Sequence, residues 1–188
     1  MSEDINFHVQ PTPNPNAIKL ILDRAVKKEG NSTYRTPMEC GENKLALELF
    51  TIRGVDQLHF FENTITLSKF GYEVWDEMMP KIEGALNEAL PAHNPEYFDP
   101  DPEAERRRSL SPELLKIEEI LDKTIRPGLQ ADGGDIMALS LEDNILLVKY
   151  QGACGTCPSS TTGTLEAIKG ILRDEYDPGI DVYIAPDF

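Results

Sequence analysis

The sequence has 188 residues, 40% of them hydrophobic and 27% charged, with a net charge of −15. These proportions are typical of a globular protein, and the length allows one medium domain or two small ones. The acidic balance argues against nucleic acid and anionic membranes as partners, because both require a basic surface. No apolar run approaches the roughly 20 residues needed to span a bilayer, so no membrane partner is expected.

The number of cysteines and the first residues of the chain indicate in which cellular compartment the protein is expected. Three cysteines are an odd number and too few for a disulfide framework, which favours a reducing environment. The chain begins Met-Ser-Glu-Asp, an acidic start without the basic and apolar regions of a secretory signal. We therefore expect a cytoplasmic protein.

The first 90 residues predict a small α+β domain. Alternation of apolar and polar residues indicates strands, and recurrence every three or four residues indicates helices. The expected elements are strands 5–9 and 17–22, a helix 44–50 capped by Asn43, a hairpin of strands 55–61 and 64–70, and a helix 73–90. Residues 23–43 are polar and are expected to form a loop with a turn at 30–32.

Residues 91–110 read as a linker between two domains. Prolines recur there among acidic residues, and no helical or strand period is visible. Such a stretch is expected to be exposed and semi-stiff. The three arginines at 106–108 are expected to form a solvated charge run, since their neighbours are acidic.

Residues 111–188 predict a second small α+β domain. Ser111 and Pro112 are typical of a helix start, and Pro127 with Gly128 indicates its end. The remaining expected elements are a tight turn at 131–135, a hairpin of strands 136–141 and 145–150, a helix 164–173 and a strand 180–184. The fold class expected for the whole chain is therefore α+β, two small domains joined by a proline-rich linker, with the order α-β-β-α-β in the second.

Two cysteines lie in the stretch GACGTCPSS (152–160), between an expected strand and an expected helix. The nearby helix N-terminus and the glycine N–H groups would favour the thiolate, which is both metal ligand and nucleophile. Cys154 and Cys157 supply only two ligands, whereas a tetrahedral metal site or a four-iron cluster needs four. No second such motif exists, so a full set of thiolates requires two chains in a symmetric dimer.

Other readings of the pair remain open at this point. A thioredoxin-like thiol–disulfide oxidoreductase would use Cys154 and Cys157 as a redox couple, and a zinc site shared between chains would use the same residues. Inert buried cysteines are disfavoured by the glycine and serine neighbours. The histidines, His8, His59 and His93, lie far off in sequence and are expected to be surface or strand residues and not ligands. Cys40 is expected to be a lone thiol in a loop or strand.

Two stretches, RPGLQADGGDI (126–136) and GACGTCPSS (152–160), closely resemble the C-terminal domain of NifU-like (Nfu-type) iron–sulfur proteins. The first 90 residues resemble the N-terminal domain of longer members, through Pro-Asn-Pro-Asn-Ala (13–17), the run 45–55 and Trp75. The resemblance implies a cluster scaffold or carrier, not an enzyme. In this reading the motif 132–135 shapes the fold, with glycines setting the turn and an aspartate bracing backbone near the cysteines.

The same resemblance implies what the chain would bind. Cys154 and Cys157 of two subunits would hold a [4Fe-4S] cluster, or a [2Fe-2S] cluster, so that cluster binding makes a homodimer. The expected partners are apo iron–sulfur recipient proteins and an upstream cluster-assembly scaffold. No other family ligand maps onto the chain, and Cys40 matches no part of the family pattern.

Overall fold

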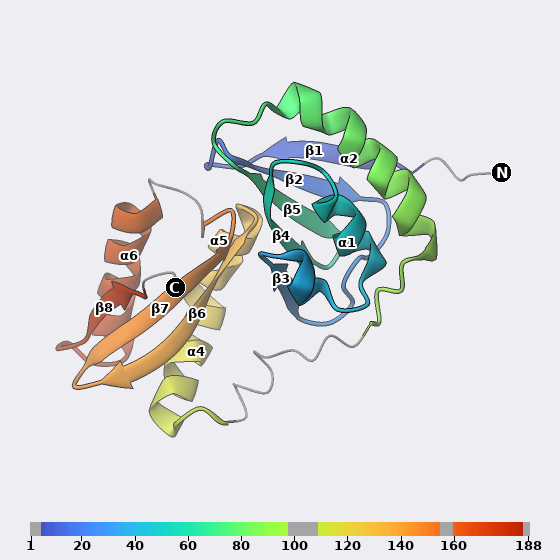
Figure 1. Cartoon of the computed structure of the whole chain (residues 1–188). Coiled ribbons are helices and arrows are strands. Elements are labelled where there is room, and N and C mark those ends of the chain that lie inside the picture. The colour runs from blue at the N-terminus through green and yellow to red at the C-terminus, as the bar shows by residue number, and fades with distance from the viewer. Residues whose placement is uncertain (1–4, 98–108, 155–159, 186–188) are drawn as a thin grey trace. The chain divides into compact units, whose positions relative to one another are not determined.

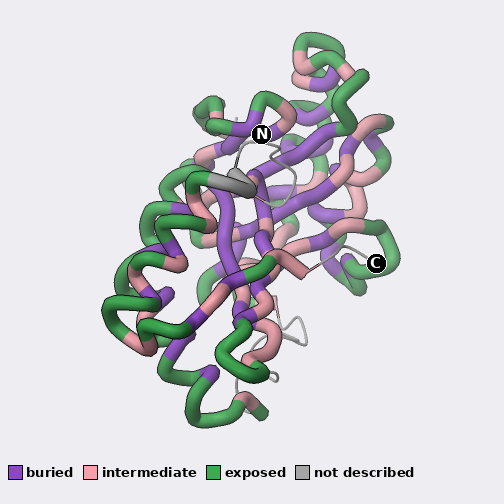
Figure 2. Tube along the Cα trace, turned by 90° about the vertical axis from the view of Figure 1, so that its left-hand side faces the viewer, coloured by how far each residue is buried: buried purple, intermediate pink, exposed green. Residues whose placement is uncertain are grey.

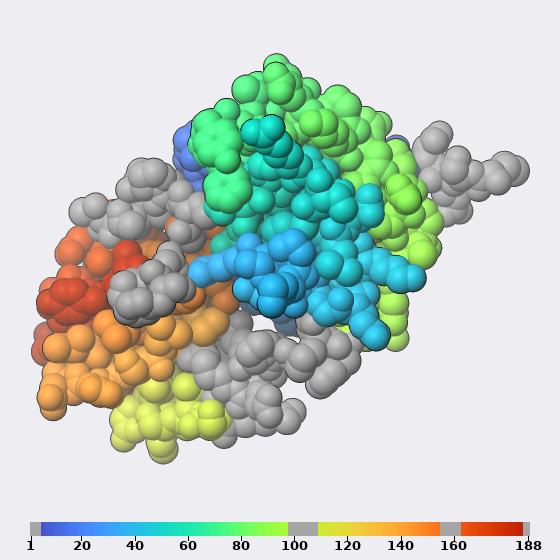
Figure 3. Space-filling view, in the orientation of Figure 1, coloured from blue at the N-terminus to red at the C-terminus, as the bar shows by residue number. Residues whose placement is uncertain are grey.

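The computed structural model describes residues 5–97, 109–154 and 160–185 (Figure 1). The chain divides into two compact units, residues 1–99 (unit 1) and 100–188 (unit 2). In the space-filling view of Figure 3, unit 1 runs from blue to green and unit 2 from yellow to red. Each unit combines one sheet with helices, which confirms the α+β class. The proposed boundaries at 1–90, 91–110 and 111–188 stay a prediction.

Unit 1 is built on a five-stranded antiparallel sheet of order β1-β2-β5-β4-β3. Its strands are β1 Phe7–Pro11, β2 Ala17–Leu22, β3 Asn31–Tyr34, β4 Val55–Phe61 and β5 Thr64–Lys69. Four of them match the expected strands to within two residues at either end. The fifth, β3, lies where a loop was expected, because its polar sequence Asn-Ser-Thr-Tyr becomes a strand only by pairing with β4.

The helices of unit 1 lie on one face of this sheet (Figure 1). They are η1 Pro37–Cys40, α1 Lys44–Phe50, α2 Trp75–Ala89 and η2 Leu90–Ala92. The expected cap of α1 is present, since the Asn43 side chain accepts a hydrogen bond from the Ala46 N–H at 3.1 Å. Along α2, Ile82 and Leu86 are fully buried in the core of unit 1.

The chain after α2 returns to unit 1 instead of leaving it at once. His93 Nε2 lies 2.7 Å from the carbonyl oxygen of Val26, and the hydroxyls of Tyr34 and Tyr97 are 3.1 Å apart. The Lys27 ammonium sits over the Tyr97 ring, 4.1 Å from its centroid. The described part of the expected linker, up to Tyr97, therefore packs on unit 1, and residues 98–108 lie outside the described residues.

Unit 2 has the order α-α-β-β-α-β. Its elements are α4 Pro112–Thr124, α5 Arg126–Ala131, β6 Gly134–Glu142, β7 Ile145–Gly152, α6 Ser160–Glu175 and β8 Asp181–Ile184. Ser111 caps α4 as expected, accepting a hydrogen bond from the Leu114 N–H at 3.3 Å. The extra helix α5 begins where Pro127 was expected to end helical structure, because proline fits the first turn of a new helix.

The sheet of unit 2 has the order β6-β7-β8. β6 and β7 form an antiparallel hairpin, and β7 pairs with β8 in parallel, with α6 as the crossover. Along β7 every second residue is buried, from Leu146 to Gly152. Figure 2 shows the buried residues, in purple, concentrated on the strands and on the inner side of the helices. The buried side of β6 and β7 faces the helices and carries the core of the unit.

Candidate functional site

The cysteine motif begins where β7 ends. Gly152 is the last residue of β7, and Cys154 follows two residues later. The Cys154 side chain is half-buried and packs against the core of unit 2. Residues 155–159, which include Cys157, lie outside the described residues, and α6 begins at Ser160. The structure therefore places one of the two expected ligands, at a strand-to-helix connection as expected.

The glycine turn of the first motif lies directly beneath Cys154. A Cβ atom on Gly134 would stand 2.3 Å from the Cys154 sulfur and 3.0 Å from the Cys154 backbone nitrogen. The Ala153 N–H also donates to the carbonyl of Gly133 at 3.0 Å. The two motifs, far apart in the sequence, thus form one structure in which the sulfur occupies the space that a side chain at 134 would need.

On the neighbouring strand β7, Gly152 also lies in close contact with the backbone of the glycine turn. It pairs with Gly134 across the β6–β7 ladder and has a φ of 62°, in the left-handed region that favours glycine. A Cβ atom there would stand 2.4 Å from the carbonyl oxygen of Gly133. Two facing glycines therefore leave one row of the sheet without side chains, and the Cys154 thiol lies over that row.

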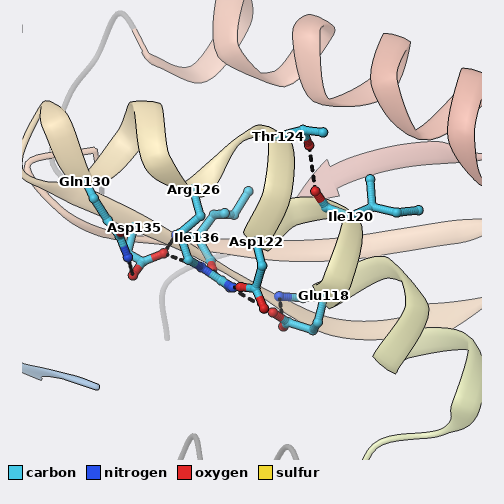
Figure 4. Close-up of polar contacts among 9 residues, drawn as sticks. Glu118, Ile120, Asp122, Thr124, Arg126, Gln130, Asp135 and Ile136 are labelled. Carbon is cyan, nitrogen blue, oxygen red and sulfur yellow. Dashed lines mark hydrogen bonds and ion pairs between the residues drawn. The ribbon is translucent and has the colours of Figure 1, made fainter. Parts of the chain in front are cut away.

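A buried charge network holds the strand that carries this turn (Figure 4). The Arg126 guanidinium donates at 2.7 Å to each of three acceptors: a carboxylate oxygen of Asp135, one of Glu118, and the carbonyl oxygen of Ile136. It also pairs with Asp122. All but Asp122 are buried. The network joins α4, α5 and β6 through charge-assisted hydrogen bonds, the strong class of such bonds.

Asp135 also braces the backbone near the cysteine, as the sequence predicted for an aspartate of this motif. Its Oδ1 atom accepts the N–H of Ile136 at 2.7 Å, and Oδ2 accepts the Gln130 side-chain amide at 3.3 Å. One residue earlier, Gly134 is the glycine beneath the Cys154 sulfur. Arg126 and Glu118 were not singled out in the sequence, because nothing local marks two charges eight residues apart as a buried pair.

A further unpredicted residue is Tyr150, on the buried side of β7. Its side chain is 4% exposed, yet its hydroxyl has no hydrogen-bond partner among the described residues. Burial raises the pKa of this hydroxyl, and the charge of a Cys154 thiolate raises it further. The sequence did contain a signal for this residue. Tyr150 is an aromatic residue with a polar hydroxyl, and it occupies a core-facing position of the strand just before the cysteine motif.

The other candidate residues lie in unit 1, where His8 is exposed. Cys40 is fully buried, with its sulfur 3.6 Å from the carbonyl oxygen of Thr36. His59 Nδ1 lies 2.8 Å from the Thr33 hydroxyl. Within residues 5–97, 109–154 and 160–185, no three histidine, cysteine or acidic side chains are grouped so as to hold a metal ion. Over the same residues, no helix has the length and apolarity needed to cross a membrane.

The chemistry that this site offers is that of a half-buried cysteine sulfur held against two glycines. A half-buried sulfur at the end of a strand can reach a soft metal ion or a second sulfur. The described part of the site is therefore Cys154 at the end of β7, supported by a Gly-Gly turn and a buried Arg–carboxylate network.

A comparison with known protein families finds a match for each of the two units. Residues 117–183 match the family described as NifU-like domain, and residues 7–93 match the family described as Scaffold protein Nfu/NifU N terminal. The chain belongs to the Nfu/NifU family, which confirms the resemblance seen in the sequence.

Named relatives agree with this family. The chain is 33% identical over 169 residues to "NFU1 iron-sulfur cluster scaffold homolog, mitochondrial" of Homo sapiens, covering 89% of this chain and 66% of the relative. It is 32% identical over 180 residues to the protein of the same name from Drosophila persimilis, covering 89% and 60%. The chain thus spans less than two thirds of the length of these relatives.

Solved structures similar to part of this chain are also known. A NifU-like protein from Saccharomyces cerevisiae, solved by NMR, matches with 24% identity and a TM-score of 0.43, covering 47% of this chain and 80% of that one. A Staphylococcus aureus protein solved by X-ray crystallography matches with 20% identity and a TM-score of 0.40, covering 45% and 99%.

Proposed function

We propose that this protein is an iron–sulfur cluster scaffold and carrier. Two subunits would hold one [4Fe-4S] cluster between their Cys154 and Cys157 side chains and then transfer it to an apo-protein. The observation that carries the proposal is the half-buried Cys154 sulfur on the glycine platform of Gly134 and Gly152, in a chain of the Nfu/NifU family. The relatives' printed name, iron-sulfur cluster scaffold, supports the same function.

The number of ligands supports a cluster shared between two chains. Each chain has one pair of closely spaced cysteines, and a [4Fe-4S] cluster takes four thiolates. The third cysteine, Cys40, is fully buried in the core of unit 1. A dimer with a two-fold axis through the cluster supplies the four thiolates with the fewest chains.

Release of the cluster would proceed by exchange of thiolate ligands. A thiolate of the recipient attacks one iron, the bond from that iron to Cys154 or Cys157 breaks, and the freed cysteine leaves as the thiolate. Repeating the exchange moves the cluster without oxidation or reduction. The protein then acts as a carrier, with apo iron–sulfur proteins as recipients and an upstream assembly scaffold as donor.

Reconstitution without oxygen tests the proposal. We expect the apo-protein to take up iron and sulfide in equal amounts, turn brown, and double its mass, with about four iron atoms per dimer. Cys154→Ser combined with Cys157→Ser should abolish uptake. Cys40→Ala is the matched control, since it removes the third cysteine from another unit and should leave uptake unchanged.

Two results would contradict the proposal. One is a colourless monomer after reconstitution of the wild-type protein. The other is cluster uptake that persists in the double serine variant. A monomer that instead reduces disulfide substrates through Cys154 and Cys157 would establish the thioredoxin-like alternative, and tight zinc without iron or sulfide would establish a zinc-bridged module.

A further inference from the structure

The hydroxyl of Tyr150 is buried without a partner in the part of the chain that the structure describes. The side chain is 4% exposed and belongs to the core of unit 2. A buried hydroxyl that makes no hydrogen bond destabilises a fold by about 1–3 kcal/mol. A phenylalanine would fill the same space without this loss of stability. Packing alone therefore does not explain why the residue has a hydroxyl group.

The ladder register places Tyr150 beside the Cys154 sulfur. On the core-facing side of β6 and β7, Tyr150 is opposite Ile136, and the next row along consists of Gly152 opposite Gly134. The Cys154 sulfur fills that glycine row, since a Cβ on Gly134 would be 2.3 Å from it. Neighbouring rows on one face are roughly 7 Å apart, within reach of a long aromatic side chain.

The electrostatics agree with this placement. After burial, the second cause that raises the pKa of Tyr150 is the charge of the Cys154 thiolate. The phenol therefore stays protonated and keeps an O–H to donate. A thiolate is a good acceptor for that proton, whereas a neutral thiol is a weak one. Metal binding at Cys154 would therefore place a good acceptor beside the hydroxyl.

We propose that Tyr150 is a positioning residue whose hydroxyl donates a hydrogen bond to the Cys154 sulfur when that sulfur binds the cluster. This inference rests on the proposed function, because it concerns the same cysteine as an iron ligand. A hydrogen bond to a ligating sulfur fixes its orientation and favours the thiolate over the thiol, which strengthens metal binding, and it draws some electron density from the sulfur, which raises the reduction potential. Tyr150 would therefore strengthen metal binding at Cys154 and raise the reduction potential of the cluster.

The test compares Tyr150→Phe with the wild-type protein in three measurements. In the apo-protein the variant should melt at a higher temperature, because the unpaired hydroxyl is gone. Titration with Co²⁺, followed by the sulfur-to-cobalt absorption band, should show about 10-fold weaker binding. In the reconstituted dimer the midpoint potential should be more negative than in the wild type.

Thr66→Val in β5 of unit 1 is the matched control. The Thr66 hydroxyl is also buried without a partner among the described residues, and the side chain is 1% exposed. This variant should likewise raise the melting temperature of the apo-protein. It should leave the cobalt affinity and the midpoint potential unchanged, since Thr66 belongs to unit 1 and the cysteines belong to unit 2.

The outcomes separate this inference from the proposed function. If the wild type binds a cluster and Tyr150→Phe equals it in cobalt affinity and potential, Tyr150 has a packing role and this inference alone is overturned. If the wild type binds neither cluster nor cobalt, Cys154 is not a metal ligand and both proposals are overturned. Opposite effects of Tyr150→Phe on the apo-protein and on the metal-bound protein support the inference.

Discussion

At the scale of single residues, glycine decides how the cysteine is held. Gly134 and Gly152 face one another across β6 and β7, and neither has room for a Cβ atom. The sulfur of Cys154 takes the space at Gly134, and the carbonyl of Gly133 takes the space at Gly152. The thiol is thereby pressed against backbone on one side and left half-exposed on the other. Such a platform fixes the ligand without enclosing it.

Gly134→Ala tests the platform directly. The new methyl group would meet the Cys154 sulfur at 2.3 Å and its backbone nitrogen at 3.0 Å, so the cysteine turn must move. We expect a loss of about 1–3 kcal/mol of stability in urea unfolding, together with loss of cluster uptake.

The control is Gly170→Ala in α6, where a Cβ would have no atom within 4 Å. Because alanine favours helices over glycine, this variant should be more stable by about 0.5–1 kcal/mol and load normally. Full uptake and unchanged stability in Gly134→Ala would show that the turn does not support the thiol.

At the scale of elements, one arginine joins the helices of unit 2 to its sheet. Arg126 stands at the start of α5 and reaches Glu118 on α4 and Asp135 on β6. The Glu118 carboxylate in turn accepts the N–H of Ala138 at 3.0 Å, farther along β6. The position of the Gly-Gly turn therefore depends on a charge network that three elements share.

Arg126→Met removes the centre of this network and leaves two buried carboxylates without their cation. Breaking a buried pair in this way typically costs about 3–5 kcal/mol. We expect this loss in chemical denaturation of unit 2, with the cysteine turn released. Arg173→Met, at a half-exposed ion pair with Asp181, should cost far less stability than Arg126→Met. Equal losses in the two variants would contradict the network.

His93, in the segment after α2, is expected to make the stability of unit 1 depend on pH. Burial is the main cause that lowers the pKa of His93 below its ordinary value of 6.5, and the charge of Lys27 adds to it, so the folded chain binds this proton less readily than the unfolded chain. Its Nε2–H donates to the Val26 carbonyl, which only accepts. Because the unfolded chain then binds the proton more tightly, stability should be full above about pH 6.5 and fall as the pH drops below it.

His93→Gln checks this assignment, since an amide can keep the bond to Val26 but does not titrate. Urea unfolding between pH 5 and 7.5 should show a smaller loss toward low pH in the variant than in the wild type. Parallel stability curves would mean that His93 does not contribute to the acid sensitivity.

At the scale of the whole molecule, each unit has a hydrophobic core of its own. The cysteine site belongs to unit 2, while the Nfu-type N-terminal domain supplies none of the described site residues. The net charge of −15 acts on the entire chain and would make two subunits repel one another in the absence of a bridging cluster. Under the proposed function, cluster loading is the step that would bring two chains together.

Calorimetry of the full chain should show two unfolding transitions, one for each core. Loading with iron and sulfide should raise only the transition of unit 2, because a ligand stabilises the unit that binds it. Arg126→Met identifies that transition by lowering it. A single transition, shifted as a whole by loading, would show that the two units unfold together.

Local chemistry made several features predictable from the sequence. Asn43 and Ser111 cap helices that begin one residue later, and both caps are formed as expected. The alternation of apolar residues indicated both hairpins. The two motifs around 126–136 and 152–160 indicated the family, and the number of cysteines indicated that one chain cannot complete a cluster site.

Contacts between residues distant in the sequence could be decided only by the tertiary structure. The polar strand β3 forms because β4 offers it a partner. Gly134 lies under the Cys154 sulfur because the β6–β7 register brings two glycines together, and a one-residue shift would face them away from the core. The burial of Arg126 and Tyr150 likewise follows from packing. Sequence patterns report the local conformation and the chemistry available, whereas the surroundings of a side chain are set by the whole fold.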